Sequence, residues 1–242
     1  MAIAARRSPS PGWLLDELSS AGRENMDLDH VARYDEKTDA GAAAEVALLG
    51  ELGLDAHSQV VDLGAGTGQF ALAVAPACAR VVAVDISPVM LERLRVKATA
   101  SAVHNVEVVH AGFVTYQHHG PAADFIYSRW ALHHLPDFWK ALALHRMRRI
   151  LRRGGVLRLA DVVYSFDPSD AEERIDQWCA TLPTDAASDG NWVRADLEEH
   201  VRDEHSTFTW LLESMMERSG FRIERAAYTP DGIFAEYVAR AL

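Results

Sequence analysis

Short apolar runs alternate with longer amphipathic stretches along most of this 242-residue chain. Apolar runs of roughly four to eight residues predict buried strands, and longer stretches with helical spacing predict the helices between them. Such alternation of strand and helix predicts an α/β protein with a doubly wound, mostly parallel sheet. We expect strands at 59–63, 80–84, 106–109, 124–127 and 156–162, followed by an antiparallel pair at 221–228 and 233–238.

Capping and turn residues mark the limits of the helices. Ser87 followed by Pro88 predicts the start of a helix that runs to about residue 100. A helix over 42–52 is expected to end at Gly53, because glycine is common just past a helix end. A longer helix is expected from 137 to 151, closed by Gly154-Gly155.

Two segments depart from the alternation. Residues 1–12 include Ser8-Pro9-Ser10-Pro11 and are expected to be disordered, whereas 13–18 predict a short amphipathic helix. Residues 165–206 are acidic and predict a helical cap inserted over the mouth of a pocket. With 49% hydrophobic residues the chain can bury one core, so we expect residues 1–242 to form a single domain.

The run from Val60 to Phe70 predicts a strand, a tight glycine turn and the start of a helix. Gly64, Gly66 and Gly68 allow the backbone to turn sharply and to approach a ligand above the sheet edge. Asp85 ends the next apolar run, where a carboxylate can accept hydrogen bonds from ribose hydroxyls. The pattern predicts a pocket for a nucleoside-bearing cofactor.

Asp62, two residues before the turn, distinguishes between cofactors of this kind. Its carboxylate would crowd the pyrophosphate of a dinucleotide, but it can help to hold an ammonium group. S-adenosylmethionine (SAM) carries a cationic amino-acid tail and no phosphate. An NAD-dependent oxidoreductase is therefore disfavoured, although residues 66–71 satisfy a loose dinucleotide-binding pattern.

Several motifs resemble those of class I SAM-dependent methyltransferases, and of the ubiquinone and menaquinone type in particular. They are Asp62–Gly68, Val84–Leu91, Asp124–Asp137, Arg152–Leu157 and Ser219–Phe221. The resemblance implies a Rossmann-like sheet of seven strands with an antiparallel C-terminal strand. It also implies SAM as the cofactor and S-adenosylhomocysteine as its product.

The resemblance further implies a set of cofactor-binding residues. Asp85 is expected on the ribose hydroxyls, Ile86 against adenine and Trp130 at the methionine end of the pocket. Tyr34, with His30, lies in an N-terminal segment that in related enzymes folds over the cofactor. The expected set is Tyr34, Asp62, Gly64, Ala65, Gly66, Gly68, Asp85, Ile86, Gly112, Phe113, Arg129 and Trp130.

The chain departs from the pattern of the family at two positions. Many members carry an acid after the third strand that binds the adenine amino group, and Gly112 stands at that position here. The backbone N–H of Phe113 is expected to reach an adenine nitrogen, but Gly112 has no side chain to bind the amino group. Arg153 replaces the proline that usually precedes the paired glycines.

His133 and His134 follow the fourth strand and are the candidate catalytic residues. A general base assists methyl transfer to a hydroxyl or a carbon acid, whereas an amine acceptor needs only to be neutral. The alternative is that one of the two histidines caps or packs the following helix. Asp161, at the end of the fifth strand, points either into the pocket or towards a helix cap.

A metal site is not expected. His200 and Glu204 share one face of a predicted helix, but no third ligand stands at a convincing spacing. The aromatic residues of the cap region serve either as walls for a substrate or as its ordinary core. They are Trp178, Trp192, Phe208 and Trp210.

The composition limits the partners. The net charge of −11 disfavours a nucleic-acid substrate, so a small molecule is expected. No apolar run is long enough for a membrane span, and two cysteines without a disulfide or metal pattern indicate the cytoplasm. Residues 13–18 allow either a homodimer contact or packing on their own domain.

The function predicted from these observations is methyl transfer from SAM to a small organic acceptor. The alternative is a SAM-binding protein of the same fold with a non-methylating role. The motifs leave open which acceptor is used, and whether oxygen, nitrogen or carbon is methylated.

Overall fold

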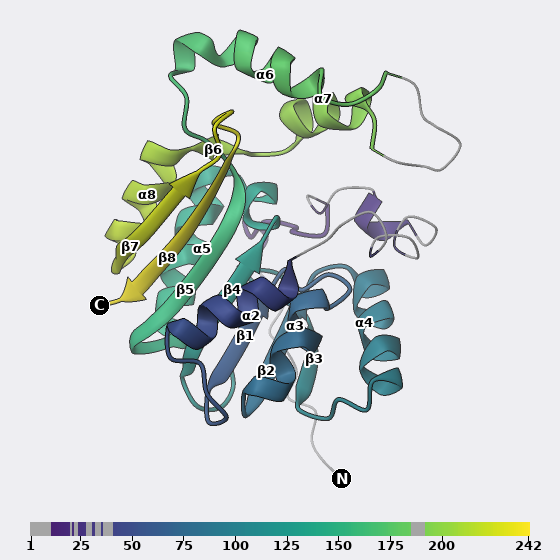
Figure 1. The fold of residues 1–242 in the computed structure, drawn as a ribbon, viewed down its shortest axis with the longest axis vertical. Coiled ribbons are helices and arrows are strands. Elements are labelled where there is room, and N and C mark those ends of the chain that lie inside the picture. Colours follow the sequence, from purple (N-terminus) through teal and green to yellow (C-terminus); the bar gives the residue numbers. More distant parts are fainter. Residues whose placement is uncertain are drawn as a thin grey trace.

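A twisted sheet runs through the centre of the molecule, with helices on both faces (Figure 1). The computed structural model describes residues 11–19, 21, 24–27, 31, 35, 41–184 and 192–242. The strand order is β3-β2-β1-β4-β5-β8-β7, and the two-residue β6 pairs with the end of β5. Strands β1 to β5 are parallel to one another, whereas β8 is antiparallel to both β5 and β7. The predicted doubly wound sheet is confirmed, with β6 as an additional short strand.

The strands are β1 (Gln59–Leu63), β2 (Arg80–Asp85), β3 (Val106–His110), β4 (Ala123–Arg129), β5 (Leu151–Tyr164), β6 (Thr207–Phe208), β7 (Phe221–Tyr228) and β8 (Phe234–Ala241). The α-helices are α2 (Ala42–Glu51), α3 (Gln69–Val74), α4 (Pro88–Ala100), α5 (Asp137–Ile150), α6 (Ala171–Cys179), α7 (Arg194–Asp203) and α8 (Thr209–Arg218). Short 3-10 turns are η1 (Glu24–Met26), η2 (Ala75–Ala77), η3 (Leu132–His134) and η4 (Pro168–Asp170).

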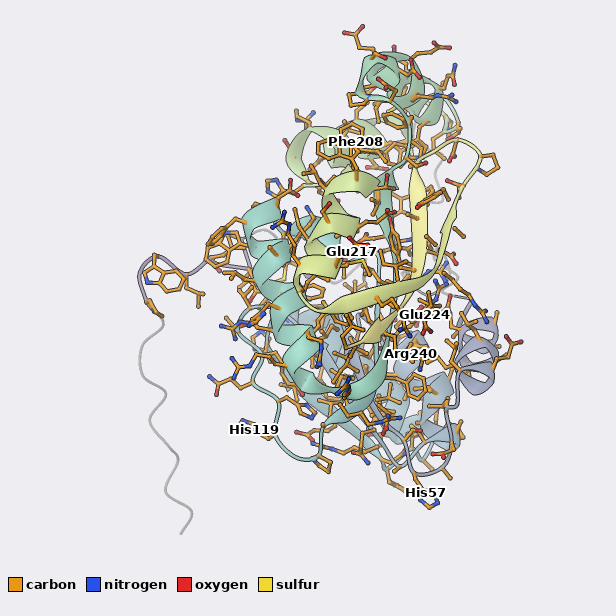
Figure 2. All side chains as sticks on the ribbon, turned by 90° about the vertical axis from the view of Figure 1, so that its left-hand side faces the viewer. His57, His119, Phe208, Glu217, Glu224 and Arg240 are labelled. Carbon is orange, nitrogen blue, oxygen red and sulfur yellow. The ribbon has the colours of Figure 1, made fainter. Side chains whose placement is uncertain are left out.

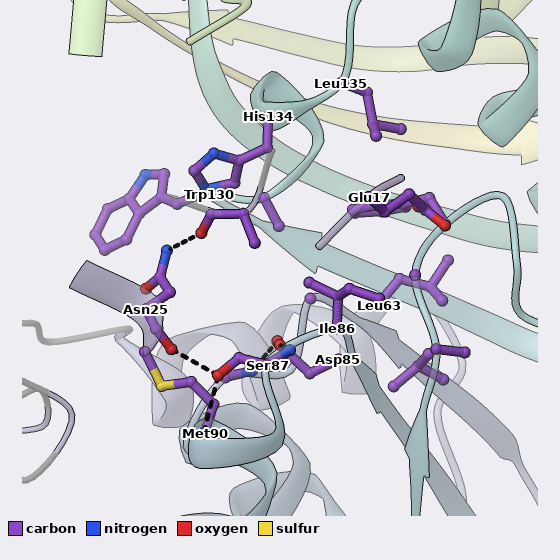
Figure 3. Close-up of a pocket in the computed structure, with 18 of the residues that line it drawn as sticks. Glu17, Asn25, Leu63, Asp85, Ile86, Ser87, Met90, Trp130, His134 and Leu135 are labelled. Carbon is purple, nitrogen blue, oxygen red and sulfur yellow. Dashed lines mark hydrogen bonds between the residues drawn. The ribbon is translucent and has the colours of Figure 1, made fainter. Parts of the chain in front are cut away.

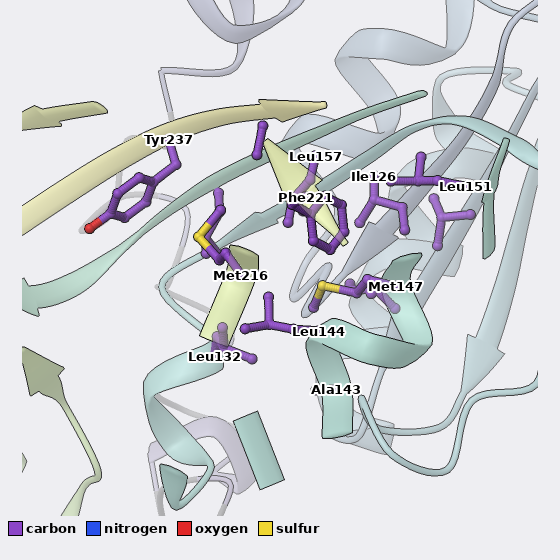
Figure 4. Packing of buried hydrophobic residues seen from close by; sticks show 14 of the residues in the cluster. Ile126, Leu132, Ala143, Leu144, Met147, Leu151, Leu157, Met216, Phe221 and Tyr237 are labelled. Atoms are coloured by element: carbon purple, nitrogen blue, oxygen red, sulfur yellow. The ribbon is translucent and has the colours of Figure 1, made fainter. Parts of the chain in front are cut away.

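The central strands are apolar on both faces because helices cover both. Val60 and Phe125 face a cluster with Leu49 of α2 and Phe70 of α3. The residues next to them along the strands face a second hydrophobic cluster, on the other side of the sheet, to which α5 and α8 contribute side chains (Figure 4). Alternate residues of a strand point to opposite faces, so each strand contributes to both halves of the core.

Strand β5 is longer than predicted. The sequence suggests a strand over 156–162 after a glycine-closed turn, but β5 begins at Leu151, directly after α5. The register with β4 shifts between the Ala123 and Phe125 pairings, which allows Gly154-Gly155 to lie inside an irregular strand rather than in a loop. At its other end β5 runs on to Tyr164 and carries the chain to the cap.

Residues 11–19 form turns, so the predicted helix over 13–18 is wrong. Backbone bonds join Leu14 to Pro11 and Ser19 to Asp16, which is the spacing of separate turns. Glu17 is only 5% exposed, because its carboxylate is held by the segment after β3. A tertiary contact therefore overrides the local helical pattern.

The cap region consists of α6 and α7 above the carboxyl ends of the strands (Figure 1). It packs on a small apolar cluster that contains Val162, Tyr164, Trp178 and Ile233. Figure 2 shows His57 and His119 at the opposite end of the molecule from Phe208, which lies beside the cap. Within the described residues, no helix has the length and apolar character needed to cross a membrane.

A buried ion pair ties α2 to the centre of the sheet. Arg158 of β5 is 3% exposed, and its guanidinium donates two hydrogen bonds of 2.7 Å to the carboxylate of Glu45. Glu236 of β8 accepts a further bond of 2.6 Å. Burial opposes the charge, but the two carboxylates raise the pKa of Arg158, so the guanidinium stays protonated.

We expect Glu45→Ala to lower the free energy of unfolding by about 3 kcal/mol, because it leaves the buried guanidinium with one partner fewer. Urea denaturation of the full chain measures the change. Glu51→Ala, at the exposed end of the same helix, serves as the control and should change stability by less than about 0.5 kcal/mol. Equal stability of the two variants would contradict a structural role for the pair.

Candidate functional site

A pocket lies where the carboxyl ends of β1, β2 and β4 meet (Figure 3). Strand β1 is flanked by β2 on one side and by β4 on the other, so the chain changes direction of winding at this point. Ligands of doubly wound sheets bind in the crevice at such a switch point. The lining residues include Glu17, Asn25, Leu63, Gly64, Gly66, Asp85, Ile86, Ser87, Met90, Gly112, Phe113, Arg129, Trp130, Ala131, His134 and Leu135.

The three glycines after β1 serve three different purposes. A Cβ on Gly64 would overlap Ala131, so this glycine allows the turn to pack against the loop after β4. A Cβ on Gly68 would overlap Leu94, so that glycine allows α3 to pack on α4. Gly66 has a φ of +53° and nothing within 4 Å of a Cβ position, and it lines the pocket. Gly66 is therefore the glycine that leaves open space for a ligand.

Asp85 closes β2 and faces the glycine turn. Its carboxylate accepts bonds from the backbone N–H of Gly66 at 2.8 Å and of Ser87 at 2.7 Å. Burial raises the pKa of Asp85, and these N–H groups offset part of that effect. The turn thus holds the carboxylate in place at the pocket wall.

Asp62 lies beneath the pocket rather than in its lining. It is 2% exposed, and its Oδ2 makes no hydrogen bond within the described residues. Burial, followed by the charge of Asp85, raises the pKa of Asp62 well above its usual range. Ala65 and Gly68 also lie outside the lining.

Glu17 supplies a carboxylate beside Gly112, where the sequence lacks one. A Cβ on Gly112 would overlap the carboxylate of Glu17, so the two occupy the same part of the pocket. The carboxylate accepts bonds from the N–H of Val114 at 3.1 Å and from the hydroxyl of Thr115 at 2.9 Å. Burial raises the pKa of Glu17, and these bonds oppose the rise.

The opposite wall is formed by the loop after β4. Trp130 has a φ of +50°, a conformation that residues other than glycine adopt rarely. Where such residues do occur, they are frequent at functional sites. Its N–H donates to the carbonyl of Ala160 at 2.9 Å, which fixes the turn. The guanidinium of Arg129 lies 4.2 Å from the centre of the Trp130 ring, and both residues line the pocket.

His133 and His134 lie in different surroundings. His134 lines the pocket, whereas His133 lies outside its lining, between the carboxylates of Asp161 and Glu204. Burial alone would lower the pKa of His133, but the two carboxylates raise it to about 10. Burial and the neighbouring His133 lower the pKa of His134 to about 3. Asp161 therefore points towards His133, and its pKa is lowered despite burial by the charge of that histidine.

The structure brings most of the residues expected from the sequence to one pocket. Nine of them line it, namely Gly64, Gly66, Asp85, Ile86, Gly112, Phe113, Arg129, Trp130 and His134. Tyr34 and His30 lie outside the described residues. Glu17 and Asn25 also line the pocket, although no local pattern in the sequence marks them. A search for an acid elsewhere in the chain, prompted by the missing one at Gly112, would have included Glu17.

The aromatic residues of the cap do not line this pocket. Trp178 packs edge-on against His200 and Phe234, with ring centres 5.5 and 6.0 Å apart. Trp192 and Trp210 are 38% and 57% exposed. These side chains build or border the cap, and the pocket walls come from the sheet and its loops.

Comparisons with known proteins agree with this geometry. A family model described as "Methyltransferase domain" matches residues 60–155. The uncharacterized methyltransferase YcgJ of Bacillus subtilis is 31% identical over 113 residues, which cover 47% of this chain and 44% of that protein. The carboxy-S-adenosyl-L-methionine synthase of Dichelobacter nodosus is 29% identical over 148 residues, covering 53% and 61%. The chain thus spans about half the length of the curated relatives it matches.

A solved structure extends the likeness in fold beyond the matched segment. The SAM-dependent methyltransferase from Clostridium acetobutylicum superimposes with a TM-score of 0.66 at 12% identity, and the match covers 88% of this chain and 98% of that one. The glycine turn, Asp85 and the loop after β4 all lie within the family match. Residues 60–155 therefore match a methyltransferase domain, and most of the chain shares the fold of a SAM-dependent methyltransferase, which supports SAM as the methyl donor.

Proposed function

We propose that this chain transfers the methyl group of SAM to a small organic acceptor. The observation that carries the proposal is the pocket at the β1–β4 switch point, with buried carboxylates at Asp85 and Glu17 and open space above Gly66. The acceptor would lie beyond Trp130 and His134, on the side that the cap covers.

The residues of the pocket fit SAM. Asp85 is placed to accept bonds from the ribose hydroxyls, and Ile86 and Phe113 provide apolar contact for adenine. Glu17 is placed to accept a bond from the adenine amino group, in the space that Gly112 leaves open. The open position at Gly66 accommodates a ligand without moving the backbone.

The electrostatics of the pocket favour a cation. Glu17, Asp62 and Asp85 are acids that burial drives towards the neutral form, as their raised pKa values indicate. A cationic ligand relieves the cost of ionising them, because an opposite charge nearby favours the carboxylate. SAM carries both a sulfonium and an ammonium group, whereas a dinucleotide adds two negative phosphates to the same acids.

Bound SAM supplies a methyl group that is already activated by its positive sulfur. The protein's task is to align the acceptor with that methyl group and to keep water out. Trp130 and His134 form the wall that would contact the acceptor, and the fixed turn at Trp130 holds them in place. His133 lies behind this wall and would act by positioning His134.

The net charge of the chain favours a small molecule as the acceptor. A chain with a net charge of −11 repels phosphate backbones, which favours a small molecule over a nucleic acid.

Buried free thiols at Cys78 and Cys179 suit the reducing cytoplasm, where we place the reaction.

A second candidate function is a SAM-binding role without methylation. One relative of this chain bears the name of a carboxy-S-adenosyl-L-methionine synthase, and the glycine turn that forms the pocket lies within the family match. The two functions differ in their product, because only methyl transfer converts SAM to S-adenosylhomocysteine in step with a methylated acceptor.

We expect the full chain to bind S-adenosylhomocysteine and Asp85→Ala to bind it about 10- to 100-fold more weakly, because hydrogen bonds to a charged group are lost. Calorimetric titration measures both affinities, with NADH as the control ligand. Formation of S-adenosylhomocysteine from SAM is then followed with a panel of small hydroxyl and amine compounds. An affinity for S-adenosylhomocysteine that is the same in Asp85→Ala and the wild type would refute the cofactor site. Binding of the cofactor without methylation of any compound would favour the second candidate function.

We expect Glu17→Gln to lose selectivity for the adenine amino group. The wild-type chain should bind S-adenosylhomocysteine about 10-fold or more tightly than S-inosylhomocysteine, which carries a carbonyl oxygen in place of the amino group. An amide at position 17 can donate to that oxygen, so the ratio should fall towards one.

Competition calorimetry gives this ratio for each variant. Asp16→Asn, at an exposed neighbouring carboxylate, is the matched control and should keep the wild-type ratio. An unchanged ratio in Glu17→Gln would show that Glu17 only supports the turn at 112–115.

A further inference from the structure

Three histidines and a glutamate gather between the pocket wall and the cap. His133 and His134 come from η3, whereas His200 lies in α7 and Glu204 directly follows it. The ring of His133 lies 4.4 Å from that of His134 and 5.0 Å from that of His200, between centres. Glu204 Oε2 lies 3.0 Å from His133 Nε2, 2.5 Å from His200 Nδ1 and 3.9 Å from His134 Nδ1.

The cluster has the composition and the dimensions of a transition-metal site. The candidate ligand atoms of His133, His200 and Glu204 all lie within 4.8 Å of one another. Around a tetrahedral zinc ion, such atoms are about 3.4 Å apart, given metal–ligand bonds of about 2.1 Å. A shift of about 1 Å in the Glu204 side chain would therefore make room for an ion.

Hydrogen bonds outside the cluster orient the two outer histidine rings. Asp161 contacts His133 Nδ1 and accepts a bond from the His133 backbone N–H at 3.0 Å. Ser206 Oγ lies 2.9 Å from His200 Nε2. With these nitrogens engaged, His133 Nε2 and His200 Nδ1 are left to face Glu204. Metal-binding histidines are held in this way, with the second ring nitrogen bonded to a carboxylate or another polar group.

Hydrogen bonding inside the cluster leaves polar atoms unsatisfied. Within the described part of the chain, Glu204 Oε2 and His134 Nδ1 are buried and make no hydrogen bond. The imidazole nitrogens near Glu204 Oε2 are close enough, but the contacts lack hydrogen-bond geometry. A cation among these atoms would satisfy them together, and its double positive charge would balance the buried carboxylate of Asp161 and the partly buried carboxylate of Glu204.

We propose that His133, His200 and Glu204 bind one divalent transition-metal ion of the Zn²⁺ or Co²⁺ type. His134 Nδ1 lies 3.9 Å from Glu204 Oε2 but outside this tight group, so its ring turns towards the ion to become the fourth ligand. Three imidazole nitrogens and one carboxylate oxygen suit metals of intermediate softness. Four protein ligands make the site closed, as in structural metal sites. The ion joins the end of α7 in the cap to the loop that carries His134, and it thereby holds the pocket wall and the cap together.

The sequence alone predicts no such site, because only His200 and Glu204 share a recognisable spacing. His133 and His134 follow β4, far from α7 along the chain, and only folding brings these histidines to the end of α7. The site is distinct from the SAM pocket, which His134 alone of the four residues lines.

Titration of the chelator-treated full chain with Co²⁺ tests the proposal. The wild type should bind one equivalent and show the visible absorption of four-coordinate cobalt. Glu204→Gln and His200→Ala should each bind Co²⁺ at least about 100-fold more weakly, since each loses a direct ligand. His205→Ala removes an exposed neighbouring imidazole and should bind as the wild type does.

Thermal unfolding gives a second readout. Zn²⁺ at about 100 times its dissociation constant should raise the midpoint of the wild type by about 5–10 °C and should leave Glu204→Gln unchanged. Circular dichroism and S-adenosylhomocysteine binding of each variant show whether the fold and the SAM pocket persist. The proposal is overturned if the wild type shows no four-coordinate cobalt spectrum. It is equally overturned if Glu204→Gln binds Co²⁺ as the wild type does, which would indicate an adventitious ion bound without Glu204. Neither result would bear on SAM binding.

Discussion

The close approach of two backbone turns determines the shape of the site. Gly64, at the end of β1, packs against Ala131 in the loop after β4, and any side chain at position 64 would overlap Ala131. This contact brings the wall with Asp85 and Gly66 opposite the wall with Trp130 and His134. The two walls can approach each other in this way only because position 64 carries no side chain.

The pocket concentrates buried acids where a folded protein ordinarily avoids them. Glu17 and Asp85 line it and Asp62 lies below, and burial raises the pKa of all three. Backbone N–H groups hold Asp85 and Glu17 in fixed positions, so their charges are directed at the ligand before it binds. Such preorganised negative charge favours a cationic ligand, and the carboxylate of Glu17, from the N-terminal segment, occupies the space beside Gly112.

The cap and the sheet are joined by polar contacts as well as by apolar packing. Trp178, Tyr164 and Ile233 give the cap a small core of its own. Glu204, next to α7, meets His133 and His134 at the pocket wall, and Asp161 of β5 supports His133 from below. The cap therefore contacts the histidines at and behind the pocket wall directly.

The sequence by itself determined the order of the elements and the glycine turn, and it predicted which strand ends line the pocket. These features depend on local patterns: apolar runs mark β1 to β5, glycines permit the turn, and an acid at each strand end marks Asp62 and Asp85. The pocket-lining residues between Asp85 and Trp130 could be predicted from their positions after strands, since parallel strands bring their carboxyl ends to one edge of the sheet.

Only the tertiary structure decided which side chains from distant segments meet. Glu17 was expected in a helix, yet its carboxylate is drawn to the turn after β3, because a buried acid must find N–H and hydroxyl donors. His133 and His134 are adjacent in the sequence, but one is enclosed by carboxylates and the other faces the pocket. Spacing along the chain carries no information about such meetings, because they depend on how elements pack rather than on how each one forms.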